Sequence, residues 1–192
     1  MTSILAAPFP DWLHASEGSM TKITDEMKLE ATRNSKCGDY RYRLERRWDA
    51  DLPAVAFIML NPSTADADVD DPTIRRCVGF AKSWGFGALI VGNLFALRST
   101  DPKALYSHPD PVGPDNDRQL LAIAQSARKI ICAWGTHGVL HDRGREVAEH
   151  FEFFPLAVLK VTAEGHPVHP LYVAASTEPK EYFAPKPDEV QS

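Results

Sequence analysis

The amino-acid sequence predicts an α/β domain of three layers (αβα), in which the central sheet is mostly parallel and has four strands. Four short apolar segments carry this prediction, because continuous apolar runs are typical of strands covered on both faces. Segments with apolar residues at helical spacing separate them, and strands that alternate with helices form a parallel sheet between helical layers. The four segments are residues 54–60, 88–94, 129–134 and 156–161.

A further strand is expected before the first of these segments. Residues 40–44, with the sequence Tyr-Arg-Tyr-Arg-Leu, alternate large apolar and charged side chains. Such alternation is typical of a half-exposed strand, so we expect an N-terminal antiparallel strand or hairpin. Residues 1–35 show no strong periodicity and are expected to form an N-terminal arm.

Three helices are expected between the strands. The first begins with Asp71 as N-cap and Pro72 in the first helical position, and Gly85 ends it. On its apolar face lies Cys77, for which packing is the expected role. The second helix is expected from about Asp115 to Ala127 and the third around residues 145–151; the second should turn Leu120, Leu121 and Ala124 inward.

Two loops and a tail complete the chain. Residues 97–114 form a long, proline-rich loop, and residues 162–172 are rich in glycine, histidine and proline. Long loops of this kind often carry function. Residues 176–192 are charged and proline-rich and are expected to form a poorly ordered tail. One domain is therefore expected over residues 36–175.

The overall charge argues against strong binding to duplex nucleic acid. The formal net charge is -5 and the pI is about 5.8, whereas non-specific binding depends on neutralising phosphates. The arginines at positions 41, 43, 46 and 47 are interpreted as a solvated face. Three scattered cysteines are typical of reduced thiols. No apolar run has the length of a membrane span and no basic leader is recognised, so we expect a cytoplasmic protein.

Polar residues follow the apolar strands at the point where each strand ends. Asn61 follows the first of them and Asn93 ends the second, while Trp134-Gly135 and His169-Pro170 come at or after later strands. In open α/β sheets the carboxyl ends of the strands bind ligands. The sequence therefore predicts one site at this edge.

Asn61 and Asn93 suggest different chemistry. The carbonyl of Asn61 could orient a water molecule, with Pro62 fixing the turn; alternatively, Asn61 satisfies backbone groups of its loop. The amide of Asn93 offers a donor and an acceptor side by side, which complements a nucleobase edge, although it could also cap a turn. Phe95 and Arg98 could line the same cleft, and core packing is the alternative for Phe95.

His169 is the third candidate. A histidine at this position could donate a hydrogen bond to a developing anion or carry a proton. His166 and His169 also suggest a metal, but no third ligand has suitable spacing, and no metal is predicted. The loop 66–71 holds four aspartates that could bind a divalent cation, although a solvated loop that caps the next helix is favoured.

Five segments together resemble a bacterial and phage family known as domain of unknown function 1643. The resemblance extends over about residues 36–175. The segments are residues 37–42 (Cys-Gly-Asp-Tyr-Arg-Tyr), 58–66 (Ile-Met-Leu-Asn-Pro-Ser-Thr-Ala-Asp), 71–77 (Asp-Pro-Thr-Ile-Arg-Arg-Cys), 93–102 (Asn-Leu-Phe-Ala-Leu-Arg-Ser-Thr-Asp-Pro) and 169–172 (His-Pro-Leu-Tyr).

The order of the strand-end residues also resembles, more distantly, the uracil-DNA glycosylase superfamily. Asn61-Pro62 is similar to an Asn-Pro of its mismatch-specific branch that positions the hydrolytic water. Asn93 falls where those enzymes read the uracil edge with an amide. Trp134-Gly135 resembles a Leu-Trp-Gly strand end, and His169-Pro170 resembles a His-Pro motif whose histidine stabilises the departing uracil anion. The resemblance implies a fold of that type.

The motifs also differ from that superfamily at three points. Ser63 replaces the glycine that follows Asn-Pro in the mismatch branch, the aspartate of the most active branch is missing, and Leu171-Tyr172 replaces a serine that meets DNA phosphate. Three cysteines cannot supply the four ligands of the iron–sulfur cluster found in some branches, so no cofactor is expected.

The sequence thus predicts a protein that binds a nucleobase, a nucleotide or single-stranded nucleic acid and hydrolyses an N-glycosidic bond. Asn61 and His169 are the predicted catalytic residues. One alternative is a binding module without catalysis, and another is a metal-assisted hydrolase that uses the Asp66–Asp71 loop. The predicted substrate-binding residues are Pro62, Ser63, Asn93, Phe95, Arg98, Trp134, Gly135 and Tyr172.

Overall fold

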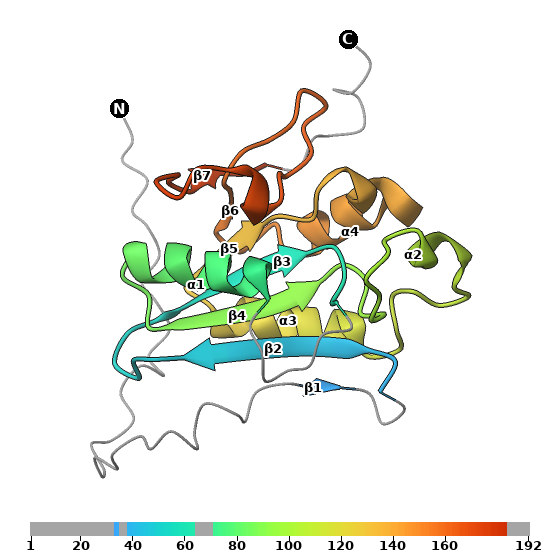
Figure 1. Cartoon of the computed structure of the whole chain (residues 1–192), viewed down its shortest axis with the longest axis horizontal. Helices are drawn as coiled ribbons and strands as arrows, with labels where there is room; N and C mark the ends of the chain where they lie inside the picture. The colour runs from blue at the N-terminus through green and yellow to red at the C-terminus, as the bar shows by residue number, and fades with distance from the viewer. Residues whose placement is uncertain (1–32, 35–37, 64–70, 184–192) are drawn as a thin grey trace, which may run out of the picture.

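A computed structural model describes residues 33–34, 38–63 and 71–183 of the chain. In these residues seven strands form one sheet, in the order β1-β2-β4-β3-β5-β6-β7 (Figure 1). The strands are β1 (Arg33–Asn34), β2 (Arg41–Arg47), β3 (Ala54–Met59), β4 (Ala88–Asn93), β5 (Lys129–Cys132), β6 (Leu156–Val158) and β7 (Lys180–Glu181).

Parallel and antiparallel pairs occupy different parts of the sheet. Parallel pairs join β4 to β3, β3 to β5 and β5 to β6, whereas β2 on β4, β1 on β2 and β7 on β6 are antiparallel. The predicted α/β class is confirmed, but the sheet has seven strands, more than the four central strands and the N-terminal antiparallel strand or hairpin that were expected. The short outer strands β1 and β7 have two residues each, too few to produce a hydrophobic period, and β7 lies in the segment predicted as a tail.

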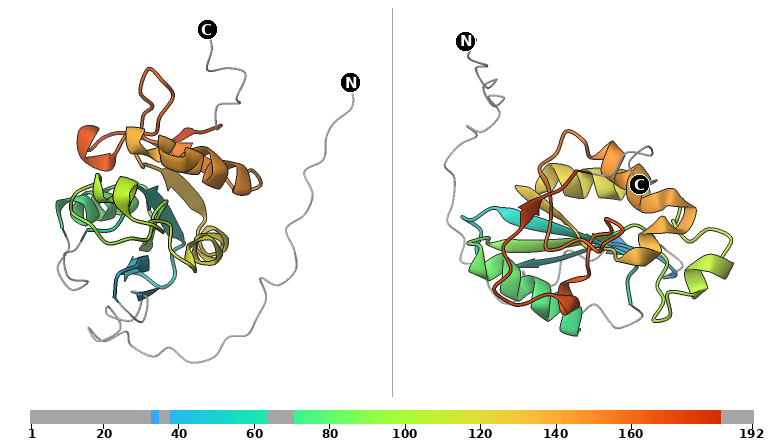
Figure 2. Two further views of the ribbon diagram at one scale, coloured as in Figure 1. Left: turned by 90° about the vertical axis from the view of Figure 1, so that its right-hand side faces the viewer. Right: turned by 90° about the horizontal axis from the view of Figure 1, so that it is seen from above.

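Helices cover both faces of the sheet (Figure 2). The helix α1 (Pro72–Ser83) packs on one face, and α3 (Asn116–Ser126) and α4 (Arg143–His150) pack on the other. In β3 the side chains alternate between the two: Phe57 belongs to the cluster under α1, and Ile58 to the cluster under α3 and α4. Both are fully buried, which explains why β3 is apolar throughout.

The ends of α1 follow directly from the sequence. Asp71 is the N-cap, its Oδ1 accepts a hydrogen bond from the backbone N–H of Ile74 at 2.8 Å, and Pro72 is the first helical residue. Gly85, just beyond the helix, has a φ of 79°, a conformation that favours glycine. Cys77 is fully buried on the packed face, and burial raises the pKa of its thiol.

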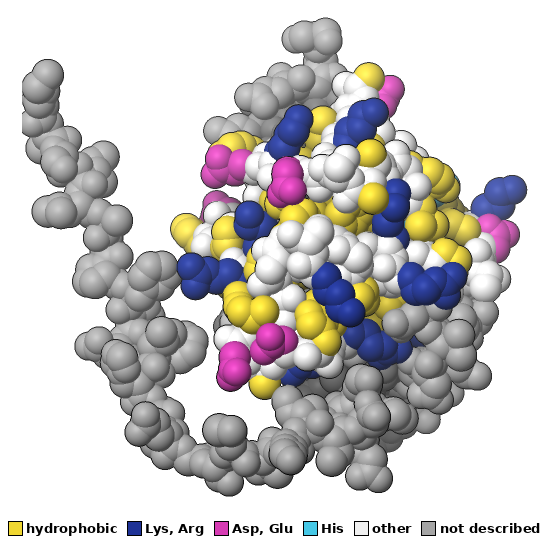
Figure 3. Space-filling model, turned by 60° about the vertical axis from the view of Figure 1, so that its left-hand side comes forward, with side chains coloured by type: hydrophobic (Ala, Val, Ile, Leu, Met, Phe, Trp, Pro, Cys, Tyr) yellow, Lys and Arg dark blue, Asp and Glu magenta, His cyan; other side chains and the backbone are white. Residues whose placement is uncertain are grey.

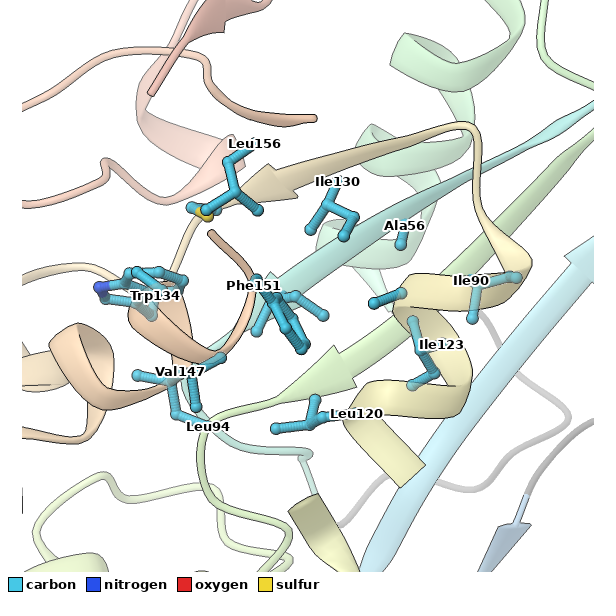
Figure 4. Close-up of a cluster of buried hydrophobic side chains, with 14 of the residues drawn as sticks. Ala56, Ile90, Leu94, Leu120, Ile123, Ile130, Trp134, Val147, Phe151 and Leu156 are labelled. Carbon is cyan, nitrogen blue, oxygen red and sulfur yellow. The ribbon is translucent and has the colours of Figure 1, made fainter. Parts of the chain in front are cut away.

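The packed face of α3 is rotated from the one predicted. Leu120, Ile123 and Ala124 are buried, as the helical spacing i, i+3, i+4 requires, whereas Leu121 is 45% exposed. The expectation that Leu121 points inward is therefore wrong. Leu120 and Ile123 pack against Gly92 of β4, where an added Cβ would lie 2.9 Å from each side chain. Figure 4 shows Leu120 and Ile123 beside Ile90 in this core.

The loop of residues 97–114 contains one short helix, α2 (Ala104–Ser107). Among the helices of the described residues, none is both long enough and apolar enough to cross a membrane.

Candidate functional site

A cavity of about 600 Å³ lies at the carboxyl ends of β3 and β4, on the face covered by α1. Its wall contains the residue after β3, the last residue of β4 and the first turn of α1. Residues of β2, of the loop after β4, of the segment 134–137 after β5 and of the loop 162–172 also line it. Sites for small ligands in proteins have volumes of about 300–1,000 Å³. The volume of the cavity therefore lies within the range of a small-ligand site.

Eight of the ten predicted site residues line this cavity. They are Asn61, Pro62, Ser63, Asn93, Trp134, Gly135, His169 and Tyr172.

Phe95 and Arg98 do not line the cavity. Phe95 is fully buried in the core on the opposite face of the sheet, so core packing, the alternative interpretation, accounts for it. Arg98 is turned toward the segment before β2, where its Nη1 donates a hydrogen bond to the carbonyl of Gly38 at 3.4 Å. Of the residues that follow Asn93, Phe95 therefore packs in the core and Arg98 binds the segment before β2.

The parallel pairing of β3 and β4 brings the two asparagines to the same cavity. Met59 pairs with Asn93 in this ladder, and the backbone N–H of Leu94 donates to the carbonyl of Met59 at 2.8 Å. Val91 and Met59 both belong to the cluster under α1, and side chains two residues apart on a strand share a face. Asn93 therefore faces α1, beside the turn that carries Asn61.

Asn93 presents an unsatisfied amide in the cavity wall. The residue is 4% exposed, and its buried Oδ1 accepts no hydrogen bond within residues 33–34, 38–63 and 71–183. A buried polar group without a partner costs about 1–3 kcal/mol. The fold keeps this cost in a residue of the cavity wall; the Oδ1 of Asn116 and the Nε of Arg76, in residues that do not line the cavity, are likewise buried without a partner among the described residues.

Two buried polar residues hold the strand end that carries Asn93. The Nδ2 of Asn116 donates to the carbonyls of Asn93 and Leu94, at 3.0 and 2.9 Å. The Nε of Arg143 donates to the same carbonyl of Leu94 at 3.1 Å, and its guanidinium pairs with Asp117 and Glu146. Helices α3 and α4 thus fix the backbone beside the candidate recognition residue.

The amide of Asn61 is held in one orientation by the loop after β4. Its Nδ2 donates to the carbonyl of Ser99 at 2.8 Å and to that of Pro62 at 3.2 Å. Only a donor can face two carbonyl oxygens, so Oδ1 is the atom available to accept a hydrogen bond from a water molecule or a ligand. Asn61 satisfies backbone groups of its loops, as the alternative interpretation holds, and still offers an acceptor.

His169 has one ring nitrogen engaged by its own backbone turn. Its Nδ1 accepts a hydrogen bond from the backbone N–H of Leu171 at 3.4 Å, so the neutral ring carries its proton on Nε2. Burial lowers the pKa of His169, and the charge of Asp71 opposes this shift. The site therefore favours a neutral imidazole that can donate a hydrogen bond.

Trp134 and Gly135 shape the wall after β5. The indole of Trp134 is 4% exposed and packs beside Val147 and Leu94 (Figure 4), close to Gly138 and Gly144. Gly135 has φ 73° and ψ -170°, a conformation that is essentially confined to glycine. Trp134 is thus a core residue that lines the cavity, and Gly135 turns the chain away from it.

Replacing Gly138 by alanine should displace Trp134. An added Cβ would overlap Cδ1 of the indole, and the surrounding core leaves the ring little room to move. We expect a loss of about 1–3 kcal/mol in the free energy of unfolding, the usual cost of overpacking. Tryptophan fluorescence and denaturant titration would measure both effects. The matched variant Gly79→Ala, on the exposed side of α1, has open space for its Cβ; it should leave the fluorescence unchanged and raise the free energy of unfolding by about 0.5–1 kcal/mol, because alanine favours the helix. Equal stabilities would contradict the packing described.

Arg41 and Arg43 are site residues that the sequence interpretation missed. Both line the cavity, and Arg41 is 8% exposed, so the interpretation of this group as a solvated face is wrong for Arg41. The backbone N–H of Arg41 donates to the carbonyl of Ala96, which brings the loop after β4 next to it. The sequence does hold a signal for this: Arg41 lies between two large aromatic residues, Tyr40 and Tyr42, at the start of a predicted strand.

Asp71 also lines the cavity, but its oxygens already have donors. Oδ1 caps α1, and Oδ2 accepts a hydrogen bond from Oγ of Ser63 at 3.3 Å. The other aspartates of the predicted cation loop, at positions 66, 68 and 70, lie outside the described residues. Within the part of the chain that is described, no three His, Cys, Asp or Glu residues gather closely enough to hold a metal ion.

One comparison with known proteins identifies the family. A family model described as "Protein of unknown function (DUF1643)" matches residues 41–171, which include every part of the cavity wall except Tyr172. No curated protein and no solved structure matches the chain. Because the matched segment makes up more than half of the sequence, the chain belongs to the DUF1643 family.

Proposed function

We propose that the protein binds a nucleobase-containing ligand in this cavity and hydrolyses its N-glycosidic bond. The observation that carries the proposal is the Asn93 amide, which is buried, lines the cavity and has an Oδ1 that no described residue satisfies. A nucleobase edge offers a donor and an acceptor side by side, the complement of an amide. Binding such an edge would satisfy the group and offset the cost of burying it.

The reaction needs two further groups. A water oxygen forms a bond to C1′ while the bond from C1′ to the base nitrogen breaks, and the electron pair leaves with the base. The Oδ1 of Asn61 would accept a hydrogen bond from this water and aim it. The Nε2–H of His169 would stabilise the charge on the departing base, which then takes up the proton that the water loses.

Two observations support this assignment of roles. Asn61, Asn93 and His169 line one cavity, and their hydrogen bonds leave Oδ1 of Asn61 to accept and Nε2–H of His169 to donate. The same residues carry the sequence resemblance to the uracil-DNA glycosylase superfamily. Fold and function are separable, so the roles rest on these side chains and not on the sheet.

A binding module without catalysis is the second candidate. The Nδ2 of Asn61 ties the loop after β3 to the loop after β4, which gives this asparagine a structural role that needs no reaction. A protein of this kind would keep recognition by Asn93 and show no turnover.

A glycosylase assay separates the two candidates. Purified protein would be given single- and double-stranded oligonucleotides that carry uracil, hypoxanthine, xanthine or hydroxymethyluracil, together with the corresponding free nucleotides. Release of a base that the Asn61→Ala variant loses would support hydrolysis and identify the substrate. Binding without release, measured by thermal shift on the same ligands, would favour the binding module. If the protein neither bound nor cleaved any of these ligands, the proposal would be refuted.

The ionisation of His169 should set the acid limit of activity. Burial lowers its pKa below the ordinary 6.5, so the neutral ring persists to lower pH than in a free histidine. Because the pKa of His169 is lower in the folded protein than in the unfolded chain, the unfolded chain takes up a proton first as the pH falls. The free energy of unfolding should therefore decrease as the pH falls from about 6.5 toward the pKa of His169 in the folded protein. We expect turnover to persist below pH 6.5, and the His169→Gln variant to lose this part of the pH dependence of unfolding. Denaturant unfolding of the wild type and of His169→Gln, measured across a series of pH values, would check this expectation. Identical dependence on pH for the two proteins would contradict it.

A further inference from the structure

Residues 168–173, which we call the His169 turn, pack on α1 and include one turn of 3-10 helix. Val173 is buried in the apolar cluster under α1, and Val168 packs against the same cluster. Between these two anchors, His169 and Tyr172 line the cavity. The place of the His169 ring in the cavity therefore depends on how firmly this turn is held on α1.

Arg76, in the second turn of α1, is hydrogen-bonded to the His169 turn. Its Nη2 donates to the backbone carbonyl of Val173 at 2.6 Å, across 97 positions of the sequence. The guanidinium also lies over the ring of Phe80, one helical turn further along α1, with its Cζ 5.5 Å from the ring centroid. Phe80 and Val173 belong to the same cluster, so this attraction keeps the guanidinium on the side of α1 where the His169 turn packs.

Arg76 differs from a freely solvated basic side chain. Basic side chains usually stand in solvent, and on the face drawn in Figure 3 they project at the surface among apolar and neutral ones. The Nε of Arg76 is instead buried, and no described residue accepts a hydrogen bond from it. An unsatisfied buried donor is unfavourable, which offsets part of the stability that the bond to Val173 contributes. The contribution of Arg76 is therefore to position more than to stability.

The same helix also reaches the other proposed catalytic side chain. In the first turn of α1, Oδ2 of Asp71 accepts a hydrogen bond from Oγ of Ser63 at 3.3 Å, and Ser63 comes two residues after Asn61. Helix α1 thus contacts the loop of Asn61 through Asp71 and the His169 turn through Arg76. Groups that act on one bond must keep a fixed separation, because small displacements lower the rate steeply.

We propose that Arg76 is a positioning residue, which anchors the His169 turn to α1 and so sets the place of the imidazole in the cavity. Arg76 does not line the cavity, so it acts through the turn and not on the ligand. This inference rests on the proposed function, in which His169 stabilises the departing base.

Single-turnover base release would test the proposal in the wild type, Arg76→Met, His169→Gln and the double variant, with the substrate that the glycosylase assay cleaves fastest. Arg76→Met keeps the apolar stem and should lower the rate about 10- to 100-fold, as expected for a displaced catalytic group. In the His169→Gln background the same substitution should have no further effect, because the imidazole that it positions is absent. Equal effects in the two backgrounds would overturn the proposal.

Two further variants keep the test decisive. Lys82→Met removes the same kind of cation–π contact at the other end of α1, where Nζ lies 5.3 Å from the ring centroid of Trp48, and should leave the rate unchanged. Arg76→Lys keeps a charged donor for the Val173 carbonyl and should recover part of the rate. It also serves as the test if Arg76→Met fails to fold, and a rate equal to that of the wild type in Arg76→Met would contradict the anchor.

Amide hydrogen exchange tests the anchor without any turnover. The backbone N–H groups of Leu171 and Tyr172 donate to Nδ1 and to the carbonyl of His169, at 3.4 and 3.0 Å. In Arg76→Met these two amides should exchange about 10-fold faster, the factor expected for the loss of one hydrogen bond that holds the segment. The amide of Leu94, which donates to the carbonyl of Met59 in the sheet, should exchange as before. Unchanged exchange of Leu171 and Tyr172 would overturn the proposal whatever the activity.

The outcomes distinguish the role of Arg76 from the proposed function. If the wild type releases a base and Arg76→Met acts alike in both backgrounds, only the role of Arg76 fails. If the wild type releases no base from any substrate, hydrolysis fails, and the role of Arg76 in the reaction fails with it. Faster exchange in Arg76→Met would then establish a structural anchor alone.

Discussion

Replacing Asn93 by alanine is expected to weaken ligand binding about 10- to 100-fold. The amide would contribute a donor and an acceptor to a nucleobase edge, and a bidentate contact of this kind is worth about 1–3 kcal/mol. Calorimetry with the ligand that the glycosylase assay identifies would measure the loss. The Asn93→Asp variant keeps the shape but replaces the donor by a second acceptor, so its loss should depend on which base is offered.

The same substitution should leave the fold nearly as stable as before. The Oδ1 of Asn93 is buried, and no described residue satisfies it, so removing the amide also removes an unfavourable term. Asn116→Ala is the matched control, because it deletes two hydrogen bonds to the strand-end carbonyls and should cost about 2 kcal/mol or more. If Asn93→Ala destabilised the protein as much as Asn116→Ala, the role of Asn93 would be structural.

Asn61→Ala is expected to lower turnover by a factor of roughly 10²–10⁴ while ligand binding persists. This range is typical for the loss of one positioned group that assists proton transfer or attack by water. Single-turnover base release and calorimetry on the same preparation would separate the two effects. Turnover that survives the substitution would remove Asn61 from the mechanism.

Asn61→Asp tests how the fold orients this side chain. The carboxylate would face the carbonyls of Ser99 and Pro62, to which Nδ2 now donates, and three acceptors in contact repel one another. We expect this variant to be less stable than Asn61→Ala, in a denaturant titration, although it is closer in shape to the wild type. The reverse order would contradict the assigned orientation of the amide.

Local features of the chain were predicted well because their causes are local. The signals that begin and end α1 act within a few residues: Asp71 is the N-cap, Pro72 follows it, and Gly85 ends the helix. As a result, α1 has the predicted bounds to within a residue. The buried strands β3 and β4 are likewise recognisable as unbroken apolar runs. From these strands follows the position of Asn93 at the edge of the sheet.

Features that depend on distant segments were missed or misjudged. The alternating pattern of the strand that contains Arg41 predicts a half-exposed strand. In the structure the loop after β4 is hydrogen-bonded to Arg41, and the side chain is buried in the cavity wall. Asn116 and Arg143 lie in helices whose sequence gives no sign that they bind the carbonyls of a strand. Phe95 follows Asn93 closely but belongs to the opposite core.

The sequence by itself determined the α/β class, the ends of α1 and the placement of Asn61 and Asn93 at the carboxyl ends of strands. These depend on hydrophobic period and capping, which act over short stretches of chain. Only the tertiary structure decided that Arg41 is buried beside the cavity, that Asn61 turns its Nδ2 toward Ser99 and that Asn93 keeps an unsatisfied amide. The burial and partners of a polar side chain depend on which distant segments cover it, and long-range packing sets that arrangement.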